Sequence, residues 1–185
     1  GCSASVSATI NVNAGTTSTI TASGATTFCA GGSVTLTANA GSTYLWSNGA
    51  QTQSITVDVD GSYYVTVTNA SGCSATSAAE AVTVNAAPVV AAITGATNIC
   101  TGSTTQLASA TTGGVWTSSD ATVATISTTG VVTGLTAGTA TMTYTVTDAN
   151  GCSASVSATI NVNAGTTATI TASGATTFCA GGSVT

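Results

Sequence analysis

Short stretches in which apolar and polar residues alternate recur along the whole chain. Four of them are 33–39 (SVTLTAN), 54–59 (SITVDV), 62–69 (SYYVTVTN) and 139–147 (TATMTYTVT). Alternation with a period of two separates the two faces of an extended strand, and the Thr and Val in these stretches favour strands. Turn-forming pairs lie between them, for example Asn48-Gly49, Asp60-Gly61 and Asn150-Gly151. The sequence therefore predicts an all-β protein.

A long internal repeat organises these strands. Residues 1–35 recur at 151–185 with one difference, Ser18 against Ala168, so the repeat unit is 150 residues long. Near-identity over the whole overlap is typical of long tandem arrays. We therefore expect the array to continue on both sides of this sequence.

A weaker repeat divides each 150-residue repeat into two halves. VTNASGCSATS at 67–77 matches VTDANGCSASV at 146–156. FCAGGSVTL around Cys29 likewise matches ICTGSTTQL around Cys100. Each 150-residue repeat therefore contains two related domains of modest size.

A tryptophan follows the first cysteine of each domain at nearly the same spacing: Trp46 follows Cys29, and Trp116 follows Cys100. Six or seven short strands with a tryptophan early in the middle describe an immunoglobulin-like β-sandwich, in which we expect Trp46 and Trp116 to anchor the two cores. The prediction is an extended array of tandem Ig-like β-sandwich domains. Its parts are the C-terminal strand of a preceding domain at 1–14, domains at 15–86 and 87–164, and the start of the next domain at 165–185.

Two segments resemble known families. WTSSDATVATISTTGVVTGLTAGTATMTYTV at 116–146 resembles the bacterial Ig-like group 2 module, and covers about half of the second domain. Residues 29–77 resemble the PKD-like or Ig-like repeats of very large secreted proteins of Bacteroidota, which include gliding-type surface adhesins. The resemblance implies an extracellular or cell-surface role in adhesion, spacing or filament formation. The chain departs from these families in lacking Lys and Arg altogether.

The absence of basic residues limits the chemistry that this sequence can perform. It has no Lys, Arg or His, and five carboxylates carry its formal charge of −5: Asp58, Asp60, Glu80, Asp120 and Asp148. Acid–base catalysis at neutral pH, binding of phosphate groups and binding of nucleic acid all depend on the missing residue types. We therefore expect no enzyme activity, no cofactor and no nucleic-acid partner.

Membrane insertion of this segment is not expected either. A transmembrane helix needs about 20 consecutive apolar residues. The longest apolar run, 86–93, is much shorter and contains Pro88.

Six cysteines carry the clearest chemistry in the sequence: Cys2, Cys29, Cys73, Cys100, Cys152 and Cys179. No two of them lie close together in the sequence and His is absent, which argues against a zinc site. The cysteines instead indicate disulfides, formed in an oxidising compartment.

Two pairings of these cysteines are open, and free thiols are the third alternative. Bonds within each domain would join Cys29 to Cys73 and Cys100 to Cys152. In an Ig-like sandwich, however, those positions lie at opposite poles, about 20 Å apart, whereas disulfide Cα atoms lie within about 7 Å. Bonds between stacked domains would instead join Cys29 to Cys152, and Cys100 would reach into the following unit. Cys2 and Cys179 would pair outside this sequence.

Other candidate sites have simpler structural explanations. Asp58 and Asp60 precede Gly61 and suggest a turn rather than a calcium site, so no metal is expected. Rows of Thr on alternating positions suit outward strand faces, and the twist of an Ig-like sheet does not suit a flat ice-binding array.

The sequence thus predicts a structural repeat of an extracellular surface fibre, filament or adhesin stalk. Its partners would be neighbouring repeats of the same chain and parallel copies in a fibre. The alternative is an adhesive module that binds a ligand such as carbohydrate or ice.

Overall fold

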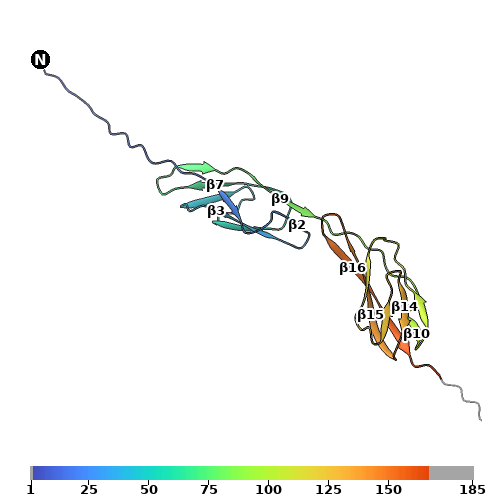
Figure 1. Cartoon of the computed structure of the whole chain (residues 1–185). Helices are drawn as coiled ribbons and strands as arrows, with labels where there is room; N and C mark the ends of the chain where they lie inside the picture. The colour runs from blue at the N-terminus through green and yellow to red at the C-terminus, as the bar shows by residue number, and fades with distance from the viewer. Residues whose placement is uncertain (1, 167–185) are drawn as a thin grey trace, which may run out of the picture. The chain divides into compact units, whose positions relative to one another are not determined.

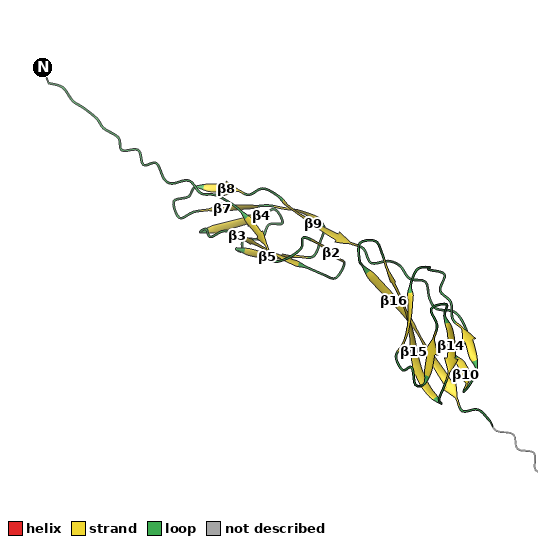
Figure 2. Ribbon diagram, in the orientation of Figure 1, coloured by secondary structure: helices red, strands yellow, loops and turns green. Residues whose placement is uncertain are grey.

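The computed structural model describes residues 2–166, and this part of the chain contains strands and no helix (Figures 1 and 2). The chain forms two compact units. Unit 1 contains the chain up to Pro88 together with Asp148–Ser153, and unit 2 contains Val89–Thr147 and the chain from Ala154 onward. Each unit is an Ig-like β-sandwich, so the predicted fold class is confirmed.

Unit 1 has two layers of strands. The first layer is an antiparallel sheet in the order β1 (Ile20–Ala22), β3 (Val34–Ala38), β5 (Ser54–Val57). The second layer contains β4 (Thr43–Trp46), β7 (Val65–Thr68) and β8 (Ser74–Thr76), and also β2 (Thr27–Cys29), β9 (Glu80–Asn85) and β6 (Gly61–Tyr63). Only Tyr64 separates β6 from β7, so the two parts of this layer follow one another along the chain.

Strand β3 shows how alternation in the sequence builds the core of unit 1. Val34, Leu36 and Ala38 are buried against Trp46 and the other core residues. The intervening Thr35 and Thr37 point the other way, and their hydroxyls form hydrogen bonds with Thr56 Oγ1 at 3.2 Å and Ser54 Oγ at 3.0 Å on β5. The period of two therefore places an apolar face inward and a row of hydroxyl pairs outward.

Unit 2 repeats this arrangement. One layer has the order β10 (Asn98–Cys100), β16 (Ser153–Asn163), β15 (Gly138–Thr147), β12 (Val115–Ser118). The other has the order β11 (Thr104–Gln106), β14 (Val131–Gly134), β13 (Ala124–Ile126). Leu107, Met142 and Ile160 are almost completely buried between the two layers.

One sequence, SASVSATINVN, occurs at both 3–13 and 153–163 and has a different structure at each place. At 153–163 it is β16, which lies between β10 and β15, and Ile160 is 0% exposed. At 3–13 no strand is present, and the equivalent Ile10 is 84% exposed. Neighbouring strands, rather than intrinsic propensity, therefore decide whether this segment forms a strand.

Candidate functional site: the cysteine-bearing turns

A disulfide joins Cys29 to Cys152, which are 123 residues apart in the sequence and 5.5 Å apart at their Cα atoms. Cys29 ends β2, and Cys152 lies in the turn between β15 and β16, a turn that belongs to unit 1. Of the two pairings considered from the sequence, the structure contains Cys29–Cys152, and both cysteines lie in unit 1. The alternative bonds, Cys29–Cys73 and Cys100–Cys152, are excluded because Cys29 and Cys152 are bonded to each other.

Backbone hydrogen bonds hold Cys29 at the end of a parallel strand pair. Strand β2 runs parallel to β9, and Cys29 lies opposite Asn85. The N–H of Ala30 donates to the carbonyl of Asn85 at 2.8 Å, and the N–H of Gly32 donates to the carbonyl of Cys29 at 2.9 Å. Gly31 lies in the turn between Ala30 and Gly32 and has a φ of 90°, a conformation that favours glycine.

A carboxylate shapes the turn that carries Cys152. Asp148 Oδ1 accepts hydrogen bonds from the N–H groups of Asn150 and Cys152, both at 2.9 Å. The N–H of Asp148 in turn donates to the carbonyl of Cys152 at 2.9 Å. These bonds hold the backbone of Cys152 in the turn. Cys152 Sγ lies 3.8 Å from the carbonyl oxygen of Asn85.

Cys73 occupies a turn of the same construction in unit 1. Asn69 Oδ1 accepts hydrogen bonds from the N–H groups of Ser71 and Cys73, both at 3.0 Å. The N–H of Asn69 donates to the carbonyl of Cys73, also at 3.0 Å. The amide oxygen of Asn69 thus takes the place of the Asp148 carboxylate.

Cys100 occupies in unit 2 the position that Cys29 has in unit 1. It ends β10, which runs parallel to β16, and lies opposite Asn163. The N–H of Thr101 donates to the carbonyl of Asn163 at 2.9 Å, and the N–H of Ser103 donates to the carbonyl of Cys100 at 3.0 Å.

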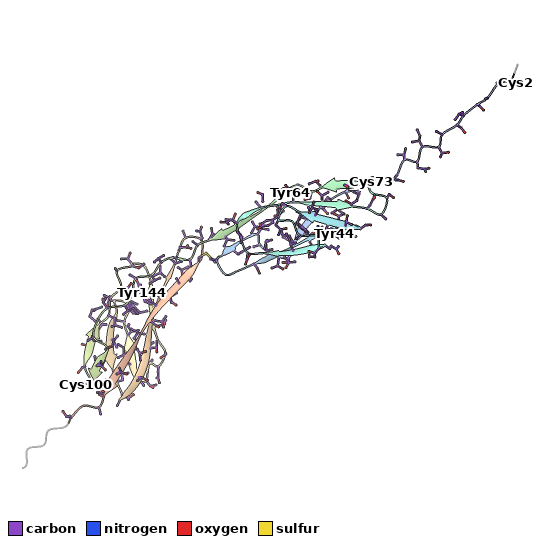
Figure 3. The ribbon with its side chains drawn as sticks, turned by 180° about the vertical axis from the view of Figure 1, so that it is seen from behind. Cys2, Tyr44, Tyr64, Cys73, Cys100 and Tyr144 are labelled. Carbon is purple, nitrogen blue, oxygen red and sulfur yellow. A yellow bond between two sulfur atoms is a disulfide. The ribbon has the colours of Figure 1, made fainter. Side chains whose placement is uncertain are left out.

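The remaining cysteines are free thiols within the described residues. Cys2 and Cys100 are exposed and Cys73 is half-buried; Figure 3 labels all three. Cys179 lies outside the residues that the structure describes.

The two tryptophans differ in their surroundings. Trp46 is 2% exposed in the core of unit 1, and its Nε1–H donates to the carbonyl of Thr52 at 2.8 Å. Trp116 packs at the edge of the core of unit 2 and is only half-buried. Its ring lies against that of Tyr144, with centroids 4.6 Å apart and an angle of 39° between the planes.

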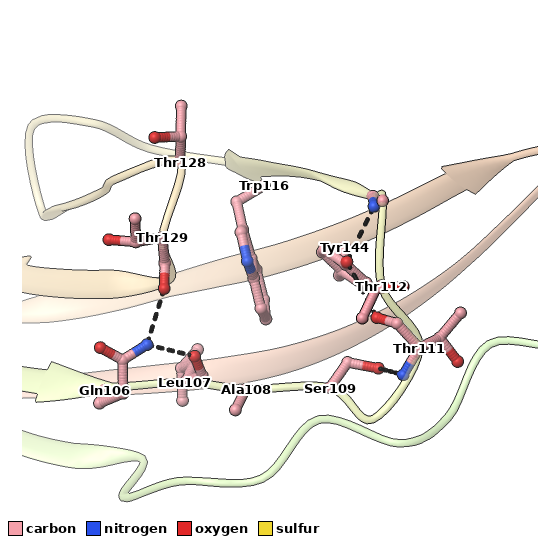
Figure 4. Close-up of a pocket in the computed structure, with 12 residues that line it drawn as sticks. Gln106, Leu107, Ala108, Ser109, Thr111, Thr112, Trp116, Thr128, Thr129 and Tyr144 are labelled. Carbon is pink, nitrogen blue, oxygen red and sulfur yellow. Dashed lines mark hydrogen bonds between the residues drawn. The ribbon is translucent and has the colours of Figure 1, made fainter.

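The exposed part of Trp116 lines an open hollow of about 320 Å³ on unit 2 (Figure 4). Most polar groups around it already bond within the protein. Gln106 Nε2 donates to the carbonyls of Leu107 at 2.7 Å and Thr129 at 2.8 Å. The hydroxyl of Tyr144 donates to the carbonyl of Thr111 at 3.0 Å. The sequence did not indicate this hollow because its walls come from separate segments.

Several carboxylates accept hydrogen bonds from backbone N–H groups in turns and at strands. Asp60 Oδ1 accepts a hydrogen bond from the N–H of Val84 and so links the turn before β6 to β9. Among residues 2–166, no three His, Cys, Asp or Glu side chains are close enough to hold a metal ion. That same part of the chain has no helix of the length and apolarity needed to cross a membrane.

Comparison with known proteins gave structural neighbours only. No protein-family model and no curated protein matches the sequence. Murine CEACAM1b is 11% identical with a TM-score of 0.34, and the match covers 80% of this chain and 99% of that one.

Two further solved structures are also similar. A C-terminal 282-residue fragment of intimin, solved with the intimin-binding domain of its translocated receptor, is 16% identical with a TM-score of 0.38 over 78% of this chain. Domains 1–6 of the surface layer protein SbsC are 24% identical with a TM-score of 0.29 over 74% of this chain. The chain spans 64% of the intimin fragment and 24% of the SbsC fragment.

Proposed function

We propose that this chain is a structural, non-enzymatic repeat of an extracellular bacterial surface fibre, filament or adhesin stalk. The observation that carries the proposal is the disulfide between Cys29 and Cys152 in a chain that repeats every 150 residues. Disulfides persist mainly in oxidising, extracellular compartments. A bond of this kind in every repeat suits a protein that must keep its length outside the cell.

The position of the bond gives the array a resistance to stretching. The 123-residue separation between Cys29 and Cys152 corresponds to roughly 400 Å of fully extended chain. Because the disulfide links the two ends of this stretch, tension along the chain passes through the bond. The 123 residues between Cys29 and Cys152 are therefore not extended even when both sandwiches unfold. Only the short segment from Cys152 to Cys179 then separates one such bond from the next.

The surface chemistry also suits an exposed stalk. Hydroxyl pairs link neighbouring strands where other proteins use ion pairs, for example Thr66 with Thr76 at 2.9 Å and Thr68 with Ser74 at 3.0 Å. Exposed ion pairs contribute little to stability, so their absence costs the fold little. Without Lys or Arg, proteases of trypsin specificity have no cleavage site in this chain.

Immunogold electron microscopy of intact producing cells, with an antibody raised against this chain, tests the proposal. We expect gold particles along filaments or stalks that extend from the cell surface. Label confined to the cell interior, or to compact soluble particles, would show that the proposal is wrong.

A second candidate function is ligand binding at the Trp116 hollow. The half-buried indole is the observation that favours it, because sugars stack on exposed aromatic faces. A Trp46→Phe variant leaves Trp116 as the single tryptophan, so its fluorescence can be followed during titration with a panel of oligosaccharides. A saturable change, matched by calorimetric binding that Trp116→Phe abolishes, would establish this function. No fluorescence change with any of the sugars would rule out this second function, and the stalk function would be the one that remains.

A further inference from the structure

We propose that Cys100 of one 150-residue repeat forms a disulfide with Cys73 of the repeat that follows it. The partner of each thiol is thus a second copy of the same repeat. This inference rests on the tandem array proposed above and names the second set of bonds that hold it together.

Two of the free cysteines, Cys100 and Cys73, have the same local structure as the two bonded ones. Cys100 and Cys29 each end a short strand that runs parallel to the last strand of the sandwich, and each lies opposite an asparagine. Cys73 and Cys152 each lie in a turn whose first residue accepts two backbone N–H groups through Oδ1. A strand-end cysteine and a turn cysteine form the observed bond. Cys2 and Cys179 are the sequence copies of Cys152 and Cys29, so Cys100 and Cys73 are the two cysteines of the repeat that this bond does not account for.

Sequence spacing agrees with this pairing. The copy of Cys73 in the next repeat lies 150 residues after Cys73 itself, and it therefore lies 123 residues after Cys100. The bonded Cys29 and Cys152 are separated by the same 123 residues. Each strand-end cysteine would therefore be bonded to the turn cysteine of the next domain along the array.

An independent contact brings the copy of the last strand of a preceding domain close to the turn that carries Cys73. Residues 11–14 (NVNA) are the copy of 161–164, and Asn13 is the copy of Asn163, the residue opposite Cys100. Asn13 Nδ2 donates to the carbonyl of Ser71 at 3.4 Å, within the turn that carries Cys73. Asn69 Nδ2, from the same turn, donates to the carbonyl of Ala14 at 3.1 Å.

The bonded pair shows the corresponding contact. There, the asparagine opposite the strand-end cysteine is Asn85, and its carbonyl oxygen lies 3.8 Å from Cys152 Sγ. Asn13 reaches the Cys73 turn through its side-chain amide, and Asn85 reaches Cys152 through its backbone carbonyl. In both cases the asparagine opposite a strand-end cysteine contacts a cysteine-bearing turn, so the Cys100 of a preceding repeat would lie near Cys73.

Formation of this bond needs an oxidant, for which a low-molecular-weight or protein disulfide is sufficient. The exposed Cys100 thiolate attacks the oxidant disulfide and releases one thiol. The Cys73 thiolate of the next repeat then attacks this mixed disulfide and releases the second thiol. Two cysteine thiols are oxidised to one disulfide, and one oxidant disulfide is reduced to two thiols.

The two sets of bonds would close overlapping loops along the array. The Cys29–Cys152 loop leaves the backbone between Cys152 and Cys179 outside it, and the loop from Cys100 to the next Cys73 encloses that segment. Every peptide bond in the interior of the array would then lie in at least one loop. A single proteolytic cut anywhere along it would not separate the two sides.

The test uses this chain lengthened by one repeat, that is, two copies of residues 1–150 followed by residues 1–35. In one variant, Cys73→Ser in the first repeat and Cys100→Ser in the second leave only the proposed pair at these positions. In the matched control, Cys100→Ser in the first repeat and Cys73→Ser in the second leave the two thiols that have no partner. Both proteins are oxidised with glutathione disulfide, alkylated, and cut with a protease specific for Asp and Glu.

Cleavage after Glu80 separates the two cysteines, with Cys73 in the fragment 61–80 and Cys100 in 81–120. We expect the first variant to yield these fragments joined by a disulfide, and the control to yield both fragments alkylated. Alkylation of both in the first variant would overturn the proposal, and so would a bond between them in the unlengthened chain.

The bond between Cys29 and Cys152 serves as the folding control in both variants. If that bond forms and the proposed one does not, the second set of bonds is wrong, whereas the fibre proposal is decided separately by imaging.

Discussion

Asn69 and Asp148 occupy the same position in two turns of one design, and each accepts two backbone N–H groups through a single side-chain oxygen. In each turn the second N–H belongs to a cysteine: Cys73 in one and Cys152 in the other. The two side chains differ, but each provides an Oδ1 atom that accepts the N–H of a cysteine. In the observed disulfide a turn cysteine of this kind, Cys152, is bonded to a cysteine at a strand end, Cys29.

Substitutions of Asp148 test the role of this acceptor. Asp148→Asn retains Oδ1, as Asn69 does, and should change the free energy of unfolding by less than about 0.5 kcal/mol. Asp148→Ala leaves two backbone N–H groups without their partner and should cost about 1–2 kcal/mol. Urea unfolding of the oxidised proteins measures both values. Equal stability of the Ala and Asn variants would contradict the assigned role.

Removal of the disulfide should destabilise the chain strongly. A chain-entropy estimate for a loop of about 100 residues gives roughly 4–5 kcal/mol. We therefore expect Cys29→Ser combined with Cys152→Ser to unfold at a clearly lower urea concentration than the parent. Cys2→Ser is the matched control, because Cys2 is exposed and unbonded. Unfolding of the double variant at the parent's midpoint would show that the bond adds no stability.

The two tryptophans should differ in their contribution to stability. Trp46→Ala removes a buried side chain and leaves the carbonyl of Thr52 without its donor, so we expect a loss of about 3–5 kcal/mol. Trp116 is half-buried, and Trp116→Ala should cost less. Thermal unfolding followed by circular dichroism gives the order. A larger loss for Trp116→Ala would mean that its contact with Tyr144 matters more than burial does.

Asp120 should make the chain sensitive to acid. The hydroxyl and then the backbone N–H of Thr122 donate to its carboxylate, and they lower the pKa of Asp120 below the usual value of 3.8. Because the folded pKa is the lower one, the stabilisation is present above pH 3.8 and is lost as the pH falls through the folded value. Carboxyl chemical shifts of Asp120 measured by NMR should titrate at a lower pH in the parent than in Thr122→Ala. Identical titration curves would contradict this prediction.

Much of the fold was predictable because the alternating stretches are long enough to define a face. Residues 33–39 contain β3, and 139–147 match β15 closely. The short parallel strands β2 and β10 were not predictable, because strands as short as these carry no periodic signal.

The poles of the sandwich favoured the observed Cys29–Cys152 pair over the bonds within each domain but left both open, and the supporting details were not predictable. Nothing in the sequence marked Asn69 and Asp148 as more than turn residues. The Trp116 hollow was also missed, because it depends on how far the indole is buried once distant segments pack together.

Single-molecule stretching of a tandem chain of these repeats tests most directly whether the array keeps its length through disulfides. In oxidising buffer we predict that each fully unfolded repeat extends to roughly 100 Å, the reach of the segment between successive Cys29–Cys152 bonds. After reduction the same repeat should reach roughly 500 Å, the length of a whole extended repeat unit. Equal extension in the two buffers would contradict the proposed role of the bond.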